Sequence, residues 1–131
     1  MRNAKLAEDD PAPGATASVV DFVTGLRWAD LDGEVRHAAT RHLLDTVGVM
    51  IAGAAGDVAT KAEAVVAAAR APGGLTVPGR RRRADLFDVA FLAGTAAHGI
   101  ELDDGYRQGS VHPGTVVVPA LLPLAERRRV S

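Results

Sequence analysis

Apolar positions recur along this chain at helical spacing. Residues three or four apart lie on one face of an α-helix, so each segment with this spacing presents one face to a core. A stretch of three residues at 75–77 is the one strand candidate, and a single short strand makes no sheet. The pattern predicts an all-α or mostly α fold whose helices occupy residues 17–26, 32–52, 58–69, 85–99 and 116–125.

Helix-capping residues stand at the ends of these segments. Asp85 precedes the fourth segment as a candidate N-cap, with Asp88 three residues later in the reciprocal capping position. Asp32 opens the second and longest segment. Gly48 and Gly53 lie within that segment and near its end, where glycine indicates close packing or a helix stop.

The last segment differs from the others because residues 116–125 are apolar on nearly every side. Such a helix is typical of one enclosed by several neighbours. Thr115 is the residue expected near its N-cap. Pro119 and Pro123 lack amide hydrogens, so the helix should bend or begin irregularly. Four or five helices of this kind cannot cover so much apolar surface, and we therefore expect the isolated chain to self-associate or to fold poorly.

Composition places the chain among ordinary soluble domains. It has 131 residues, 47% of them hydrophobic, and a formal net charge of -1. We expect a mobile arm at residues 1–16 and one helical domain at 17–131. There are no cysteines, which excludes disulfides and thiolate-bound metal clusters within these residues.

The sequence also bears on location and on two classes of partner, membranes and nucleic acids. No apolar run is long enough to span a membrane and the first residues lack a secretory pattern, which predicts a cytoplasmic protein without a membrane partner. Arginine runs at 80–83 and 127–129 have no recognition element beside them. We expect them to be solvated loops and expect no nucleic-acid binding.

Candidate chemistry gathers after the fourth helix. Glu101, Asp103 and Asp104 fall in the turn that follows Gly99, where the negative end of the helix dipole disfavours carboxylates that have no partner. Arg107 is the nearest cationic partner in the sequence. His98, on the helix before the turn, is interpreted as a structural histidine.

A second group of residues begins at His112, in a His-Pro-Gly turn. If the next helix starts near Thr115, the free amides from Gly114 onward point back toward His112 and the acidic turn. A carboxylate substrate would suit that position. Two histidines and three carboxylates are also ligand types for zinc or manganese, but their spacing matches no dedicated metal motif, and we predict no metal.

The stretch AFLAGTAAHGIELDDGYRQGSVHPGTVVVPALLPLAE, with LLDTVGVMIAGA upstream, resembles the amino-terminal part of the MmgE/PrpD family, which includes 2-methylcitrate dehydratase and cis-aconitate decarboxylase. The resemblance implies the large helical domain of a homodimeric, cofactor-free lyase that also has a smaller lid domain. It implies catalytic roles for His112 and Glu101. Around these two residues we predict a substrate-binding set, in which the two aspartates orient their neighbours or form the turn itself: Asp103, Asp104, Gly105, Tyr106, Gly114 and Thr115.

Two departures from the family pattern stand in this turn. The family often has aspartate in place of Glu101 and threonine in place of Gly105, so the carboxylate reaches one methylene further and a hydroxyl contact is absent. The family's remaining active-site histidine, lysine and tyrosine lie downstream of residue 131.

The resulting hypothesis is an amino-terminal component of a carbon–oxygen or carbon–carbon lyase, inactive alone. It would need a second copy, a partner chain or the family's carboxy-terminal region, and it would bind a small polycarboxylate. Dehydration, decarboxylation and isomerisation all stay open. The alternatives are a non-catalytic interaction or structural subunit with the same helical fold, and a truncated product without function.

Overall fold

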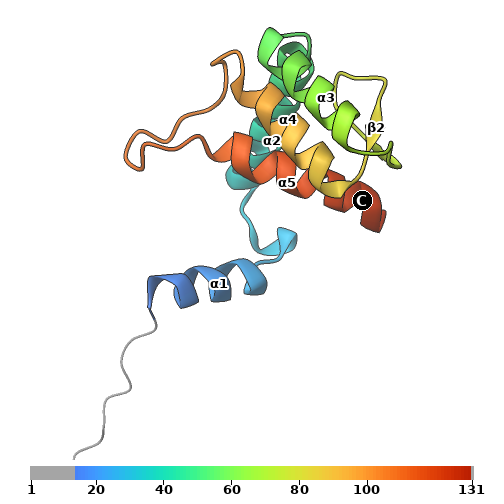
Figure 1. Ribbon diagram of the computed structural model, residues 1–131. Helices are drawn as coiled ribbons and strands as arrows, with labels where there is room; N and C mark the ends of the chain where they lie inside the picture. Colours follow the sequence, from blue (N-terminus) through green and yellow to red (C-terminus); the bar gives the residue numbers. More distant parts are fainter. Residues whose placement is uncertain (1–13, 131) are drawn as a thin grey trace, which may run out of the picture. The chain divides into compact units, whose positions relative to one another are not determined.

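Five α-helices and one short antiparallel ribbon make up residues 14–130, the part of the chain described by this computed structural model (Figure 1). The mostly α prediction is confirmed. Internal contacts divide the chain into two units, residues 1–36 and 37–131. The elements in order are α1 (Ala15–Gly25), the 3-10 turn η1 (Trp28–Asp30), α2 (Gly33–Ala54), α3 (Asp57–Ala69), β1 (Leu75–Thr76), β2 (Arg83–Ala84), α4 (Leu86–His98) and α5 (Pro113–Arg128).

The first unit holds α1 and η1. The helix begins at Ala15, inside the predicted 1–16 arm, whose first thirteen residues lie outside the described range. None of its residues is buried. The large apolar side chains exposed in this unit are Val19, Val20, Phe22, Val23, Leu26, Trp28 and Val35.

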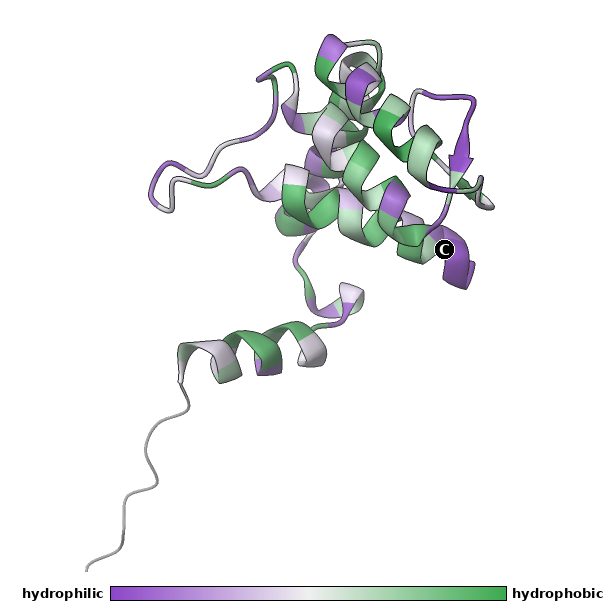
Figure 2. Ribbon diagram, in the orientation of Figure 1, coloured by the Kyte–Doolittle hydropathy of each residue, from purple (hydrophilic) through white to green (hydrophobic). Residues whose placement is uncertain are grey.

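The core of the second unit is built around α4, which runs between α3 and α5 (Figure 1). Figure 2 shows apolar residues along both α4 and α5. One face of α4 packs on α3 and the ribbon through Val89 and Leu92. Another packs on α2 and α5 through Ala93 and Ala97, which surround Met50. This central helix ends directly at the acidic turn, so its position fixes where the turn begins.

Small residues let α2 and α4 approach closely. A Cβ atom at Gly53 would overlap the carbonyl oxygen of Ala96, whereas a Cβ at Gly48 would have no atom within 4 Å. The two glycines, alike in the sequence, therefore differ in the structure. Gly53 is a packing requirement, and Gly48 occupies an open position in the middle of the helix.

The predicted N-cap at Asp85 is present, and Asp32, which opens the second predicted segment, caps its helix as well. The Asp85 carboxylate accepts hydrogen bonds from the amides of Phe87 and Asp88, at 3.1 and 3.0 Å. Asp32 accepts from the Val35 amide at 2.8 Å. The Asp88 side chain, expected to reciprocate, instead pairs with Arg70 Nε at 3.2 Å.

The strand predicted at 75–77 finds a partner that the pattern did not indicate. Leu75 pairs with Ala84 and Thr76 with Arg83 in an antiparallel ribbon. Glu126 on α5 accepts from the amide and the hydroxyl of Thr76, each at 2.9 Å. The ribbon is thereby attached to the last turns of α5.

The prediction of solvated arginine loops holds only in part for the first run, where Arg81 and Arg83 are exposed but Arg80 and Arg83 have protein partners. Arg80 pairs with Glu63 at 3.2 Å, and Arg83 donates to the Gly74 carbonyl at 2.6 Å and lies 3.6 Å from Glu126. In the second run the side chains are exposed, but the residues end α5 instead of forming a loop. Arginines 80 and 83 are thus occupied by the protein itself.

The helix α5 begins earlier than predicted. His112 is its N-cap residue and Pro113 its first residue, so Thr115 lies within the first turn and its expected place at the cap was wrong. Proline favours the first helical position because its missing amide hydrogen has no helical partner there. Pro119 and Pro123 are buried, whereas Val116, Val117 and Leu121 are more than half exposed.

Within residues 14–130, no single helix is both long and apolar enough to cross a membrane. The bent pair α2 and α3 passes the test of length and composition only when the two are taken together, with 77° between them.

Candidate functional site

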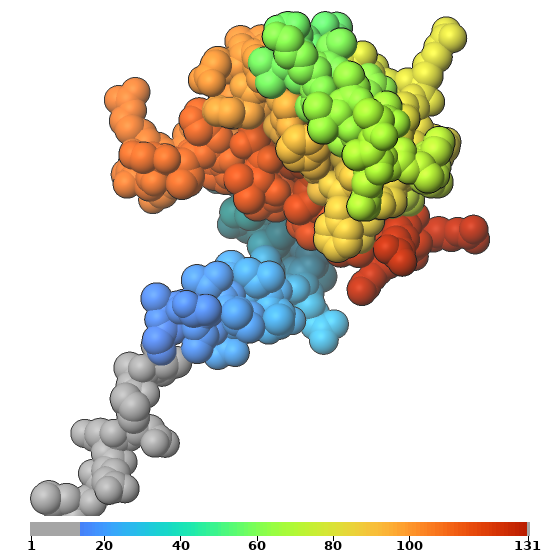
Figure 3. All heavy atoms as spheres, in the orientation of Figure 1, coloured from blue at the N-terminus to red at the C-terminus, as the bar shows by residue number. Residues whose placement is uncertain are grey.

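The candidate site lies on the loop that joins α4 to α5, residues 99–112, part of which projects from the second unit (Figure 3). Its first half turns sharply because Glu101 adopts the left-handed conformation, with φ 53°. Its second half closes on itself, since Tyr106 and Val111 exchange backbone hydrogen bonds at 2.8 and 3.4 Å. These two turns bring the start of α5 back to the end of α4.

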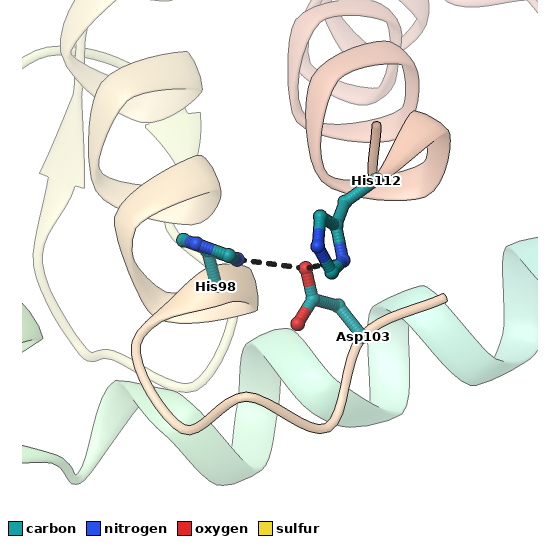
Figure 4. Close-up of side chains that lie close together, drawn as sticks. All are labelled: His98, Asp103 and His112. Carbon is teal, nitrogen blue, oxygen red and sulfur yellow. Dashed lines mark hydrogen bonds and ion pairs between the residues drawn. The ribbon is translucent and has the colours of Figure 1, made fainter. Parts of the chain in front are cut away.

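Asp103 is the centre of the site (Figure 4). Its side chain is only 2% exposed, and it lies between two imidazoles that are about half exposed. His98 Nδ1, from the last residue of α4, is 2.8 Å from Asp103 Oδ2 in a hydrogen bond. His112 Nδ1, from the N-cap of α5, is 3.1 Å from the same oxygen. One buried carboxylate thus holds an imidazole from each helix.

The two imidazoles contact Asp103 differently. His112 Nδ1 is at ion-pair distance, but its direction to the carboxylate does not make a hydrogen bond, and this nitrogen is buried without one. Asp103 Oδ1 is likewise buried without a hydrogen-bond partner. The two rings stand edge to face, with centroids 5.1 Å apart and planes at 62°. His98 is therefore the principal donor to the carboxylate.

The proton affinities follow this geometry. Burial of the Asp103 carboxyl opposes its ionisation, but the hydrogen bond from His98 and the charges of both imidazoles outweigh burial and lower its pKa below the usual 3.8. In turn the hydrogen bond and charge of Asp103, assisted by the charge of Glu101, raise the pKa of His98 above 6.5. Both shifts favour a protonated His98 beside an ionised Asp103.

Glu101 stands at the outer side of the site. Its side chain is 76% exposed, and its Oε1 lies 3.5 Å from His98 Nε2. It therefore contacts the site through His98. Arg107, expected to be the partner of the acidic turn, forms no ion pair within residues 14–130; the carboxylates use histidines and a backbone amide instead.

Asp104 binds the first turn of α5. Its Oδ1 accepts the Gly114 amide hydrogen at 2.9 Å, so one of the amides expected to be free for a substrate is already occupied. A Cβ at Gly114 would lie 2.6 Å from that oxygen and 2.7 Å from Thr46 Oγ1. The Thr115 hydroxyl donates to the His112 carbonyl at 2.9 Å. Asp104, Gly114 and Thr115 together fix the backbone that carries His112.

Two open pockets flank this loop. The smaller, about 310 Å³, has His112 in its wall and is lined by Gly105, Tyr106, Arg107, Ser110, Val111 and His112. The larger, about 740 Å³, lies between α2 and α5 and is mainly apolar. Gly105 and Tyr106 line both pockets, which places these two predicted substrate-binding residues between them.

The ligand atoms of His98, Asp103 and His112 lie within 4.8 Å of one another, a spacing that a divalent cation could bridge. Hydrogen bonding and charge pairing within the group already account for the arrangement of His98 and Asp103. The expectation that no metal binds here stays a prediction.

His98 was interpreted as a structural histidine with satisfied partners, because it lies on a small-residue helix. Its ring does have partners, and both of its nitrogens face carboxylates, so its link to the acidic turn is what sequence reasoning missed. Its place at the end of α4, three residues before Glu101 and five before Asp103, was the available signal.

These observations define a mostly α domain that carries acid–base groups on the loop between its two best-packed helices. The profile of the MmgE/PrpD N-terminal domain matches residues 17–131, and the chain belongs to this family, which confirms the resemblance. A curated relative, the cis-aconitate decarboxylase-like protein oryM of Aspergillus oryzae, is 27% identical over 121 residues, or 92% of this chain. The chain spans about a quarter of that relative's length (25%). No solved structure matches the chain.

Proposed function

We propose that this chain is the amino-terminal helical part of a lyase that acts on a small polycarboxylate by proton transfer at His112, without a metal or organic cofactor. One observation carries the proposal: His112 lines an open pocket while a buried carboxylate stands 3.1 Å from its Nδ1. Because Nδ1 faces Asp103, Nε2 is the nitrogen that exchanges a proton with a ligand.

The lining of the smaller pocket favours an anionic ligand. Its side chains include a guanidinium, an imidazole and two hydroxyl groups, and no carboxylate. The Arg107 guanidinium, which has no ion pair in the described range, has the fork geometry that binds a carboxylate through two hydrogen bonds. A volume of about 310 Å³ is at the small end of ligand pockets, as expected for a compact acid.

Proton bookkeeping distinguishes the candidate reactions. In a decarboxylation the C–C bond breaks, CO₂ leaves, and the carbon that keeps the electron pair takes one proton, so one positioned acid suffices. Dehydration needs a base for the C–H proton and an acid for the departing hydroxide, and isomerisation needs both roles as well. His112 lines the pocket and Glu101 does not. This arrangement and the relative's name favour decarboxylation.

We also propose that activity needs a second copy, a partner chain or a further region of the family's fold. The smaller pocket is open to solvent. The helix α5, which follows His112, exposes Val116, Val117 and Leu121. A cytoplasmic location, with neither nucleic acid nor membrane as a partner, belongs to the same proposal. The exposed apolar face equally favours the alternative of a non-catalytic interaction subunit, which turnover would exclude.

The test uses the assembled protein with the rest of the family's fold present. Carbon dioxide release measures decarboxylation of cis-aconitate-like acids, and a gain in ultraviolet absorbance from a newly formed conjugated double bond measures dehydration of citrate-like acids. His112→Ala should reduce turnover by about two to four orders of magnitude, the range for a positioned acid or base. Glu101→Gln should act similarly if the charge takes part, and Glu101→Asp should be mild.

His37→Ala is the matched control, because His37 is an exposed histidine of α2 outside the site. Unchanged turnover in His112→Ala, with assembly intact, would remove His112 from the mechanism. Efficient turnover by the isolated chain would show that no second chain or region is needed.

A further inference from the structure

His98 contacts two carboxylates, those of Glu101 and Asp103, and its position at the end of a helix requires neither contact. A cation at the C-terminal end of α4 is favoured by the helix dipole, but that explains neither the direction of the ring nor its two partners. Nδ1 donates to Asp103 Oδ2 at 2.8 Å, and Nε2 lies 3.5 Å from Glu101 Oε1. With His112 Nδ1 at 3.1 Å from the same Asp103 oxygen, four ionisable groups stand in a row: Glu101, His98, Asp103, His112.

The row contains one well-formed hydrogen bond to the buried carboxylate. Asp103 Oδ1 has no partner, and the contact from His112 lacks hydrogen-bond direction. A carboxylate that is 2% exposed would be poorly held without the N–H of His98. The orientation of the Asp103 side chain, which faces His112 Nδ1, therefore depends on His98.

We propose that His98 is a positioning residue, which fixes Asp103 against His112 Nδ1 and joins Glu101 to the same row of charges. This inference rests on the proposed function of His112, which it deepens. When His98 is protonated, the charges of Glu101, His98 and Asp103 alternate in sign. The Nε2 atom of His112 then remains to exchange a proton with a ligand in the smaller pocket. His98 then acts through Asp103 and does not touch the substrate.

Two substitutions separate orientation from mere space filling. His98→Asn keeps an amide N–H at the position of Nδ1, and asparagine is tolerated at a helix C-terminus. His98→Ala removes the donor. In the assembled enzyme, His98→Ala should lower kcat by about tenfold to a hundredfold, as expected when a catalytic group is misplaced by an ångström, with KM changed less than about twofold. His98→Asn should recover most of kcat.

A second measurement needs no turnover. Histidine ring ¹⁵N spectra of the protein should show His98 Nδ1 as a hydrogen-bonded N–H, and Asp103→Ala, which removes the acceptor, should abolish that signature while leaving His37 and His42 unchanged. If His112→Ala leaves turnover intact, the proposed function fails, yet these spectra still test the row. If His112→Ala abolishes turnover and His98→Ala does not lower kcat, the positioning role alone is overturned.

Two further results would also overturn it. Equal loss of kcat in His98→Asn and His98→Ala would mean that the imidazole is needed for something other than its Nδ1 donor. Stoichiometric zinc that is lost together with activity on treatment with EDTA would make the three groups metal ligands instead of a hydrogen-bonded row.

Discussion

Gly53→Ala should destabilise the second unit, because α2 and α4 meet backbone to backbone at this residue. The new Cβ would overlap the Ala96 carbonyl oxygen and lie 3.0 Å from its carbonyl carbon. A backbone group cannot rotate away as a side chain can, so the two helices must separate. Overpacking of this kind costs about 1–3 kcal/mol, and the better helix propensity of alanine offsets roughly 0.5–1 kcal/mol. The net expectation is a loss of about 1 kcal/mol, within a range of roughly 0–2.5 kcal/mol.

Gly48→Ala is the matched control, since it makes the same chemical change in the same helix. A Cβ at this position would have no atom within 4 Å. Only the propensity effect remains, and Gly48→Ala should stabilise the chain by roughly 0.5–1 kcal/mol.

Thermal unfolding followed by far-ultraviolet circular dichroism measures both changes. For a domain of this size, one kcal/mol moves the Tm by roughly 4–8 °C, so the two variants should differ in opposite directions from the parent chain. All samples need the same protein concentration, because association would itself shift the Tm. Equal gains in Tm for both variants would refute the close crossing of α2 and α4 at Gly53.

Two more outcomes are expected. The pKa of His98 is raised in the folded chain, so the contribution of His98 to stability is complete below pH 6.5 and is lost as the pH rises through its folded-state pKa. The pKa of Asp103 is lowered, so the contribution of Asp103 is complete above pH 3.8 and is lost as the pH falls through its folded-state pKa. The Tm measured against pH should therefore have its plateau between these values, and His98→Asn should remove the alkaline loss. Sedimentation velocity of the isolated chain should show association, because apolar surface such as that of Val116, 69% exposed, is worth about 25 cal/mol per Å² when covered; a concentration-independent monomer with a sharp melt would contradict this.

Local signals predicted the helices and the caps at Asp32 and Asp85, but not the start of α5. Asp32 and Asp85 act within three residues of the amides that they cap, so sequence spacing alone places them. The start of α5 was misplaced because two local signals competed: Thr115 is a good capping residue, but Pro113 favours the first helical position, so the helix begins at Pro113 with His112 as its N-cap.

Long-range pairing was not predictable from the pattern. Thr76 meets Glu126 fifty residues away, and the pairing of Leu75 with Ala84 depends on where α3 and α4 place the ribbon. The partner of the acidic turn was misjudged for the same reason. Arg107 is close in sequence, but the loop turns so that His98 and His112 face the buried carboxylate instead.

The helix dipoles explain how neighbouring carboxylates come to have different partners. Asp104 stabilises the positive end of α5 by accepting the Gly114 amide, where a negative charge is favoured. Asp103, the preceding residue, faces the negative end of α4, where a carboxylate is disfavoured unless a cation stands between. The hydrogen bond to Asp103 raises the pKa of His98, which favours the cationic form of His98 at this position. Because one carboxylate is fixed to each helix, the turn sets the distance between the end of α4 and the start of α5. The geometry that positions His112 is therefore the same geometry that relieves the buried charge.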